Sequence, residues 1–209
     1  ANPTPAAPPN LKVYRWANED TETPVSLAFE GNPLADIPEP GAGQDIRFGD
    51  NFAVRGAGAN TQLAFTARNG KYVVILTTED GVTFTHRTLT TDFLGGAGLG
   101  TAFGEGNTLW LKVNGQPLRR VAFDLAAGSA TTIQPTVSAT IVGPNITGIG
   151  YDPVTRRLAG VDYVAHTLSV FDMSDPTAPV RIGDPVPFPT ANGNGNGTGD
   201  ADLLGDRVA

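Results

Sequence analysis

Residues 192–202, NGNGNGTGDAD, combine residue types and a spacing that could bind a metal ion. Oxygen-bearing side chains occupy the first, third, fifth, seventh and ninth positions of a calcium-loop pattern, with glycine at the sixth: Asn192, Asn194, Asn196, Thr198, Asp200 and Gly197. Alternating oxygen ligands around a glycine turn are what Ca²⁺ requires. The first ligand is nevertheless a neutral Asn, and Leu203 stands at the twelfth position, where the pattern needs a bidentate Glu. We therefore interpret the segment as a Gly/Asn connector and assign no metal ligand to it.

The two histidines, His86 and His166, are the residues best suited to zinc binding or acid–base catalysis. His86 lies in the alternating segment TFTHRTL, which predicts a strand with this side chain facing solvent, and His166 lies in a turn before LSVFDM. A zinc site would need both histidines and a carboxylate, and nothing in the sequence places them together. No serine occupies a G-x-S-x-G pattern, so a serine triad has no support either.

Asp152, Asp172 and Asp175 could supply paired carboxylates for sugar chemistry. Each of them precedes a turn or a proline, where an Asp side chain accepts hydrogen bonds from the backbone that follows it. We therefore expect a structural role for all three.

Four aromatic side chains could form a platform for carbohydrate: Tyr14, Trp16, Trp110 and Tyr163. In LKVYRW, alternation places Lys12, Tyr14 and Trp16 on one face of a predicted strand. Aromatic residues in alternating strands belong more often to a core or to cross-strand pairs, and that is the interpretation we favour.

The glycine-rich residues 96–106, GAGLGTAFGEG, superficially resemble a phosphate-binding loop. They lack the lysine of a P-loop and precede the predicted strand NTLWLKV instead of a helix, so a turn is the better interpretation. Asn145 and Asn196 begin glycosylation sequons, both in predicted loops.

Short strands separated by turns fill the chain, and its 26 Gly and 17 Pro disfavour helix. The clearest unit is residues 137–188, with strands ITGIGY, LAGVDY, TLSVFDM and PVRIGDPV. Two groups of four strands precede it, beginning near residues 45 and 96, and the pair LKVYRW and PVSLAF precedes those. GDADLLGDRVA has room for one or two strands more. This recurrence predicts a β repeat architecture.

The two ends of the chain each supply an incomplete group of strands. Residues 1–10, ANPTPAAPPN, predict an extended proline-rich arm, and residues 11–209 a single domain. We expect residues 11–29 and 199–209 to share one sheet, either within the chain or between neighbouring subunits, because open strand edges invite uncontrolled pairing. Closure within the chain would give about four blades of roughly 50 residues each.

The composition excludes some function classes. The net charge of −7, from 14 Lys+Arg against 21 Asp+Glu, argues against a nucleic-acid partner. No segment approaches the roughly 18 apolar residues of a membrane helix. The chain has no cysteine, only three lysines, abundant Thr, Asn and Gly, and begins at Ala1, which fits a processed mature product, although a chosen boundary would look the same. We expect an extracellular location.

Several segments resemble a known class of repeats: VYRWANED, RFGDNFAVRGAGANTQLAF, LAGVDY with LSVFDMSDPTAPV, and FPTANGNGNGTG. They resemble the repeats of bacterial secreted and surface proteins of β-propeller type, and SVFDMSDPTAPV also resembles the LVIVD surface-protein repeat, in which a strand ending in Asp runs into a Ser-Asp-Pro turn. The resemblance covers residues 11–209. It implies a secreted or cell-surface β-propeller-like protein and carries no catalytic residues.

We therefore predict an all-β, propeller-like protein of about four blades that acts outside the cell as a structural or interaction module. It would self-associate into a homo-oligomer or filament through strand edges and the arm, without enzymatic activity, cofactor or metal. The alternative is a glycan-binding or hydrolytic extracellular propeller. A central pocket with clustered Asp, Arg or Trp would favour that alternative, whereas a filled centre would favour assembly.

Overall fold

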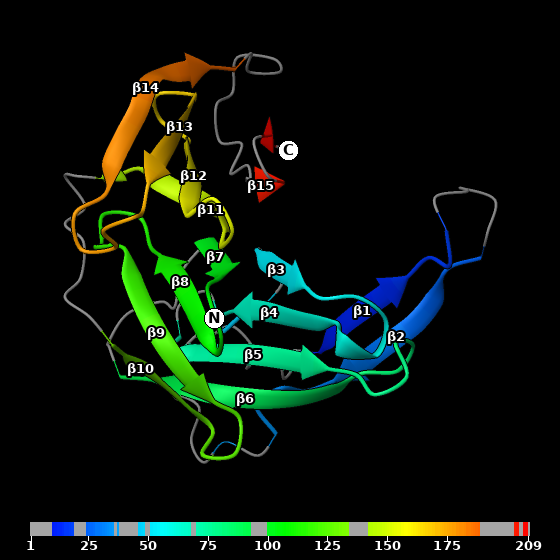
Figure 1. Cartoon of the computed structure of the whole chain (residues 1–209). Helices are drawn as coiled ribbons and strands as arrows, with labels where there is room; N and C mark the ends of the chain where they lie inside the picture. The colour runs from blue at the N-terminus through cyan, green and yellow to red at the C-terminus, as the bar shows by residue number, and fades with distance from the viewer. Residues whose placement is uncertain are drawn as a thin grey trace, which may run out of the picture.

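The computed structural model describes residues 10–18, 24–35, 37, 46–48, 51–67, 70–92, 100–133, 142–188, 203–204 and 207–208. These residues form an all-β protein built from antiparallel meanders (Figure 1). The first meander comprises β3 (Phe52–Arg55), β4 (Gln62–Thr66), β5 (Tyr72–Thr77) and β6 (Thr85–Thr91). The second comprises β7 (Gly100–Phe103), β8 (Thr108–Lys112), β9 (Arg119–Asp124) and β10 (Ser129–Thr132). The third comprises β11 (Ile146–Asp152), β12 (Arg157–Asp162), β13 (Thr167–Asp172) and β14 (Val180–Pro187).

Two hairpins accompany the meanders. The terminal hairpin pairs β1 (Leu11–Arg15) with β2 (Ser26–Gly31), and a second, short hairpin pairs β15 (Leu203–Leu204) with β16 (Arg207–Val208). A 3-10 turn, η1 (Gly58–Asn60), connects β3 to β4. The predicted all-β, propeller-like fold is thereby confirmed, while the number of about four blades stays a prediction.

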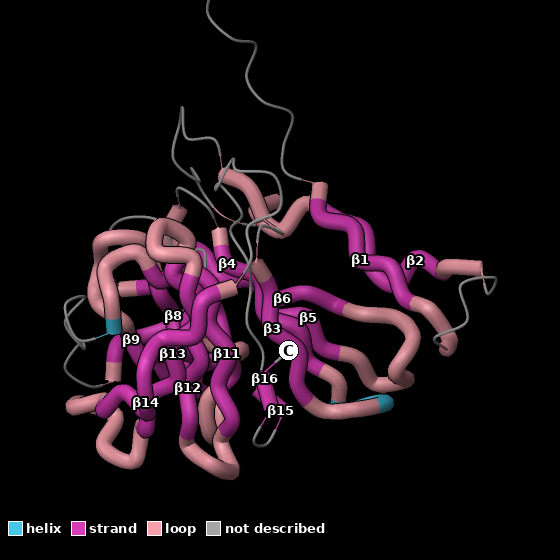
Figure 2. Tube along the Cα trace, turned by 90° about the horizontal axis from the view of Figure 1, so that it is seen from above, coloured by secondary structure: helices cyan, strands magenta, loops and turns pink. Residues whose placement is uncertain are grey.

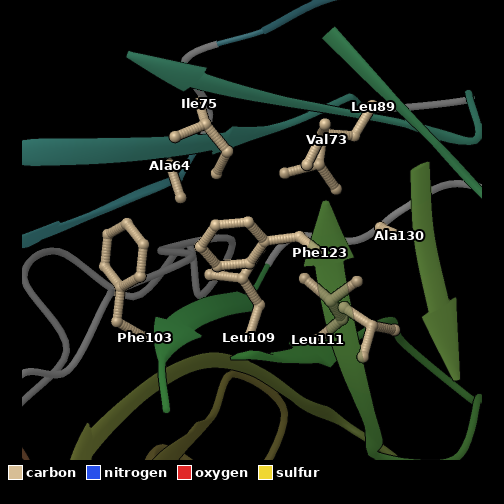
Figure 3. Close-up of a cluster of buried hydrophobic side chains, with 10 residues drawn as sticks. Ala64, Val73, Ile75, Leu89, Phe103, Leu109, Leu111, Phe123 and Ala130 are labelled. Atoms are coloured by element: carbon tan, nitrogen blue, oxygen red, sulfur yellow. The ribbon is translucent and has the colours of Figure 1, made fainter. Parts of the chain in front are cut away.

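The first and second meanders face each other and form one nearly closed, barrel-like sheet of eight strands. Along one side β6 pairs with β10 in parallel, and on the other side β7 lies against β3. Apolar side chains from both meanders fill the space between them, as Figure 3 shows: Ala64, Val73, Ile75, Leu89, Phe103, Leu109, Leu111, Val121, Phe123 and Ala130. The interior of the barrel-like sheet is therefore filled by side chains.

The central strands of the first and second meanders are apolar on both faces because each of these two meanders packs against two neighbouring sheets. On β5, Val73 and Ile75 face the second meander, whereas Val74 and Leu76 face the terminal hairpin. The run YVVILT, rich in β-branched residues, is therefore buried along its length instead of alternating between core and solvent.

The third meander covers the other face of the second. Trp110 of β8 points away from the barrel interior and joins Ile149, Leu158 and Phe171 in a second core. Here β7 and β11 approach closely at Gly100, where an added Cβ would lie 2.2 Å from the carbonyl oxygen of Thr147. Only glycine fits that position.

The terminal hairpin packs on the free face of the first meander. Leu11 and Phe29 contact the cluster formed by β4 and β5. The sheets thus follow one another as a curved stack, from the terminal hairpin through the first, second and third meanders (Figure 1), and Figure 2 shows the terminal hairpin on the opposite side of the first meander from the other two.

The expected pairing of residues 11–29 with residues 199–209 is not seen in the part of the chain that the structure describes. Among the described residues, β1 pairs only with β2, and β15 pairs only with β16, in separate two-stranded sheets. The reason is that β15 lies against β11 and β12 of the third meander instead of reaching the terminal hairpin (Figure 1). Pairing of the two segments between neighbouring copies stays a prediction.

Candidate functional site

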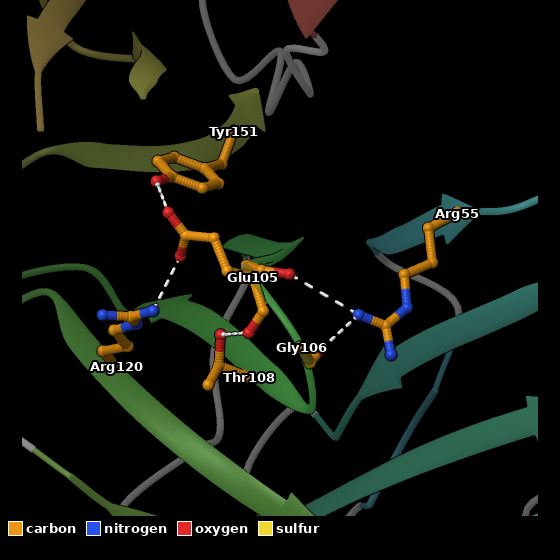
Figure 4. A network of polar contacts seen from close by, with 7 residues as sticks. Arg55, Glu105, Gly106, Thr108, Arg120 and Tyr151 are labelled. Carbon is orange, nitrogen blue, oxygen red and sulfur yellow. Dashed lines mark hydrogen bonds and ion pairs between the residues drawn. The ribbon is translucent and has the colours of Figure 1, made fainter. Parts of the chain in front are cut away.

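One polar cluster joins all three meanders, and we call it the junction network: Arg55, Glu105, Arg120 and Tyr151 (Figure 4). Glu105 lies in the turn between β7 and β8 and accepts two hydrogen bonds through its carboxylate. Tyr151 Oη of β11 donates to Oε1 at 2.6 Å, and Arg120 Nη2 of β9 donates to Oε2 at 2.7 Å. Glu105 is therefore held by residues of the second and third meanders together.

The first meander reaches the same turn through Arg55. Its Nη1 donates to the carbonyl oxygen of Gly106, and its Nε donates to Gln62 Oε1 at 2.8 Å. The guanidinium also lies over the Phe103 ring, 4.4 Å from the centroid. The turn that carries Glu105 is thus fixed from both sides.

The protonation states of the junction network suit a structural clamp. Burial alone would raise the pKa of Glu105, but the hydrogen bond from Tyr151 and the positive charges of Arg120 and Arg156 outweigh it and hold that pKa below its ordinary value. Burial and the neighbouring carboxylate raise the pKa of Tyr151 well above its ordinary value. At neutral pH the carboxylate is ionised and the phenol is protonated, so neither group is poised for proton transfer.

Trp110 lies next to the junction network and contacts Arg120. The Arg120 guanidinium lies 5.6 Å from the Trp110 ring centroid, within range of a cation–π interaction. Trp110 Nε1 and Arg120 Nε are both buried without a hydrogen-bond partner among the described residues. The glycan-binding or hydrolytic alternative needs clustered Asp, Arg or Trp in a central pocket. Here Arg120 is bound to Glu105, and Arg55 is bound to the Gly106 carbonyl oxygen and to Gln62.

The histidines lie apart. The sequence predicts that His86 of β6 faces solvent, but its side chain is half-buried because the terminal hairpin covers it. The ring centroids of His86 and Phe29 lie 5.5 Å apart in an edge-on arrangement. His166 occupies the turn between β12 and β13, as predicted, with a φ of 53° and its ring against Phe188. Within the described ranges, no three His, Cys, Asp or Glu side chains come close enough to hold a metal ion.

The predicted structural role of the three aspartates is confirmed. Asp152 accepts hydrogen bonds from Val154 N at 2.9 Å and Thr155 Oγ1 at 2.6 Å. Asp172 accepts from the backbone N–H of Ser174, and Asp175 from that of Thr177. The same arrangement occurs, without having been predicted from the sequence, at three further turns, where the aspartates are Asp80, Asp124 and Asp162.

Three of the four candidate aromatic residues are separated from one another by the fold. Trp110 is in the core, Tyr163 accepts a hydrogen bond from Asn114 Nδ2 at 2.8 Å, and Tyr14 lies on the terminal hairpin. Tyr14 and Trp16 are exposed instead of buried, at 50% and 57%. A single carbohydrate platform of all four is therefore excluded, and the pair on the hairpin remains.

The outer face of the terminal hairpin is apolar, and we call the four residues Tyr14, Trp16, Val25 and Leu27 the hairpin face. Tyr14 lies opposite Leu27 in the ladder, and the two-residue period places Trp16 and Val25 next along the same side. All four are between 45% and 57% exposed. The opposite side of the hairpin carries Leu11 and Phe29, which pack on the first meander. A two-stranded sheet at the solvent-exposed end of a protein seldom carries apolar residues on both of its faces.

Lys112 was not among the residues singled out from the sequence either. It ends β8 and is fully buried, with Nζ donating to the carbonyl oxygen of Val113 at 2.8 Å. Burial lowers its pKa to about 8, against the opposing charge of Asp162. A lysine of lowered pKa is a potential nucleophile, but this one is closed off from solvent, so we assign it no catalytic role. Its place in the pattern TLWLK, two residues after Trp110, is the signal that predicts its burial.

A small hollow of about 200 Å³ lies beside His86, lined also by Pro33, Ile37 and the β9–β10 turn. The charged side chain that lines it, Arg87, is hydrogen-bonded to the protein backbone. Arg87 donates to the carbonyl oxygens of Leu125 and Ala126 at 2.8 and 2.9 Å. The hollow is smaller than the roughly 300 Å³ at which ligand pockets begin, and its arginine is committed.

Other sequence motifs are described only in part. The calcium-loop pattern of residues 192–202, and with it Asn196, lies outside the described residues. Of the glycine-rich residues 96–106, those from Gly100 onward form β7 and the turn to β8. Asn145 lies in a turn, as predicted, and Thr147 of its sequon is buried in β11.

Comparisons with protein-family models, with curated proteins and with solved structures find no significant match. The resemblance to LVIVD-type surface repeats therefore stays a prediction from the sequence. In the part of the chain that the structure describes, no helical segment has the length and hydropathy of a membrane span.

Proposed function

We propose that this protein is a structural interaction module that self-associates through the hairpin face. The observation that carries the proposal is the exposure of Tyr14, Trp16, Val25 and Leu27 at one end of a stack of sheets. Every other sheet contact in the stack is an apolar face packed on an apolar face.

A stack of repeated sheets ends in a terminal unit that has one face without a neighbour. Such stacks stay soluble when the terminal unit has a polar outer face. The terminal hairpin has the opposite character, because a continuous apolar strip crosses both of its strands. Exposed apolar patches of this kind commonly mark contacts with another macromolecule. A second copy is the partner we propose, since the chain already uses this mode of sheet packing within itself.

The exposed edge of β1 adds a second means of association. Among the described residues, β1 pairs only with β2, so its other edge can add a strand, whereas β2 already accepts a hydrogen bond from Phe84 N at the carbonyl oxygen of Ala28. The proline-rich arm of residues 1–10 lies outside the described residues except for Asn10, and its role in assembly is proposed from the sequence alone. A secreted or cell-surface location, proposed from the composition, would suit such a module.

The test is the oligomeric state of matched variants. The double variant Trp16→Ser, Leu27→Ser removes two large side chains from the hairpin face without entering the core. Val154→Ser is the control, since Val154 is 89% exposed in the β11–β12 turn, away from the hairpin face. Light scattering across a concentration series should show a rising mass for wild type and for Val154→Ser, and a constant monomer mass for the double variant. Equal masses for all three would refute the proposal.

Glycan binding is the second candidate, because Tyr14 and Trp16 present two aromatic rings on one exposed face. Titration with soluble oligosaccharides, followed by Trp16 fluorescence, distinguishes the two proposals. A saturable change that is lost in Trp16→Phe would favour glycan binding, and no change would leave self-association as the use of this face.

A further inference from the structure

The turn between β8 and β9 contains the dipeptide Asn114-Gly115. The Asn114 side chain is exposed, and Gly115 has a φ of 71°, which glycine adopts without strain. The backbone N–H of Gln116 donates to the carbonyl oxygen of Val113 at 3.0 Å and closes the turn. Asparagine is a chemically labile residue, and a following glycine makes it more so because no side chain shields the next backbone nitrogen.

Two hydrogen bonds tie this dipeptide to the third meander. The backbone N–H of Gly115 donates to the carbonyl oxygen of Pro144, just before β11, at 2.8 Å. The side-chain amide of Asn114 donates through Nδ2 to Tyr163 Oη, in the turn after β12, at 2.8 Å. The backbone nitrogen and the side-chain amide of the pair are thus both held by the same neighbouring unit.

We propose that Asn114 is a site of spontaneous deamidation whose rate is set by the docking of the third meander. Water is the only reagent that the reaction consumes. The Gly115 nitrogen gives up its proton to solvent and bonds to Asn114 Cγ, the bond from Cγ to Nδ2 breaks, and the amide nitrogen leaves as ammonia after taking up a proton. Water then opens the resulting succinimide at either carbonyl carbon, which leaves aspartate or isoaspartate at position 114.

Docking of the third meander slows this reaction at both reacting atoms. The attacking nitrogen, Gly115 N, must lose a proton that it shares with the Pro144 carbonyl oxygen. The departing nitrogen, Asn114 Nδ2, must give up its hydrogen bond to Tyr163. Movement of the third meander away from this turn breaks both bonds together. The reaction therefore follows the fraction of molecules in which this contact is open.

The products weaken the contact that restrains the reaction. Both of them lack the Nδ2 donor, so the hydrogen bond from Asn114 to Tyr163 is lost. Isoaspartate also adds one backbone atom to a turn in which Gly115 N and Gln116 N both have fixed acceptors, and this shifts those hydrogen bonds out of register. A chain that has reacted therefore docks its third meander less firmly, and such chains accumulate with the age of the protein.

Peptide mapping by mass spectrometry measures the rate at position 114 during incubation at mildly alkaline pH. Tyr163→Phe removes the hydrogen bond to the departing amide and should raise the rate roughly fivefold, the factor that corresponds to one ordinary hydrogen bond. Tyr72→Phe is the matched control, since it removes a hydroxyl from the first meander, and it should react at the wild-type rate. A synthetic peptide of residues 110–119 gives the rate of the unrestrained pair, which should exceed the rates of all three proteins.

Equal rates for wild type and Tyr163→Phe would overturn the proposed control by docking. Equal acceleration in Tyr163→Phe and Tyr72→Phe would show a general loosening of the fold and would overturn it as well. Reaction of the wild-type protein as fast as the peptide would mean that the third meander gives no protection. Absence of product in Tyr163→Phe, after the peptide has reacted completely, would show that position 114 is not a deamidation site in the folded protein.

Discussion

At the scale of single residues, Glu105 and Lys112 show how a buried or half-buried charge can be structural. Glu105 receives hydrogen bonds from Tyr151 and Arg120, which belong to two different meanders. Lys112 has one hydrogen bond and no salt bridge among the described residues. The Glu105 carboxylate therefore strengthens a contact between sheets. The buried Lys112 side chain, by contrast, lowers the stability of the fold when it is protonated.

Glu105→Gln should destabilise the protein because Arg120 loses its ionised partner. The expected loss in unfolding free energy is about 1 kcal/mol, at the lower end for a charged hydrogen bond, since the Glu105 side chain is partly exposed. Urea unfolding at pH 7 measures it. The control is Glu79→Gln, an exposed glutamate after β5, which should match wild type. Equal stabilities for the two variants would show that the junction network adds nothing.

Lys112 predicts a rise in stability with alkaline pH. Its pKa is about 8 in the folded protein, below the ordinary lysine value of 10.5 that applies to the unfolded chain, so between these values the unfolded chain binds more protons. Unfolding free energy should therefore increase from about pH 8 to about pH 10.5. The Lys112→Met variant should lose this increase. Parallel pH profiles of unfolding free energy for wild type and Lys112→Met, measured by urea unfolding, would show that burial of Lys112 does not produce this pH dependence.

At the scale of elements, aspartates end the strands of the third meander in one repeated way. Asp152, Asp162 and Asp172 each accept the backbone N–H two residues later, which fixes the start of the following turn. The hydrogen bond from Thr155, together with those from the backbone, lowers the pKa of Asp152. These turns set the register that brings Tyr151 to Glu105.

Asp152→Ala should lower the unfolding free energy by about 1 kcal/mol through the lost turn hydrogen bonds. Asp152→Asn keeps an acceptor oxygen for Val154 N and should lose less than half as much. Thermal unfolding of the three proteins at pH 7 gives the comparison. A loss of the same size for Asn and Ala would mean that charge, and not the turn hydrogen bond, is what matters.

The sequence predicts most strands but not how they meet. Alternation, β-branched runs and Gly-containing turns suffice to find segments such as YVVILT and TLSVFDM, because those signals are local. The burial of His86 depends on Phe29, which is 57 positions away, and no local pattern contains it. The junction network is equally long-range, since Glu105 and Tyr151 come from different meanders. The alternation in LKVYRW predicts its shared aromatic face, whereas the position of that face at the end of a stack depends on distant contacts.

At the scale of the whole molecule, the chain is a curved stack with two unlike apolar ends. One end is the hairpin face, and at the other end Val180, Ile182 and Val186 of β14 are exposed. Sheets between them are apolar on both sides because each has two neighbours. Packing of another copy on the hairpin face gives the terminal hairpin the second neighbour that the internal sheets already have, and that is the core of the proposed function.

The accessibility of Trp16 decides whether the hairpin face is the surface through which copies associate. The chain has two tryptophans, of which Trp110 is 1% exposed and Trp16 is 57% exposed, so a soluble quencher reports on Trp16 almost alone. Iodide quenching is measured across a protein concentration series, with Trp16→Phe giving the background from Trp110. We expect quenching of Trp16 to fall as the protein concentration rises, in step with the mass from light scattering. Quenching that stays constant while the mass rises would show that the copies associate through another surface and would refute the proposed function.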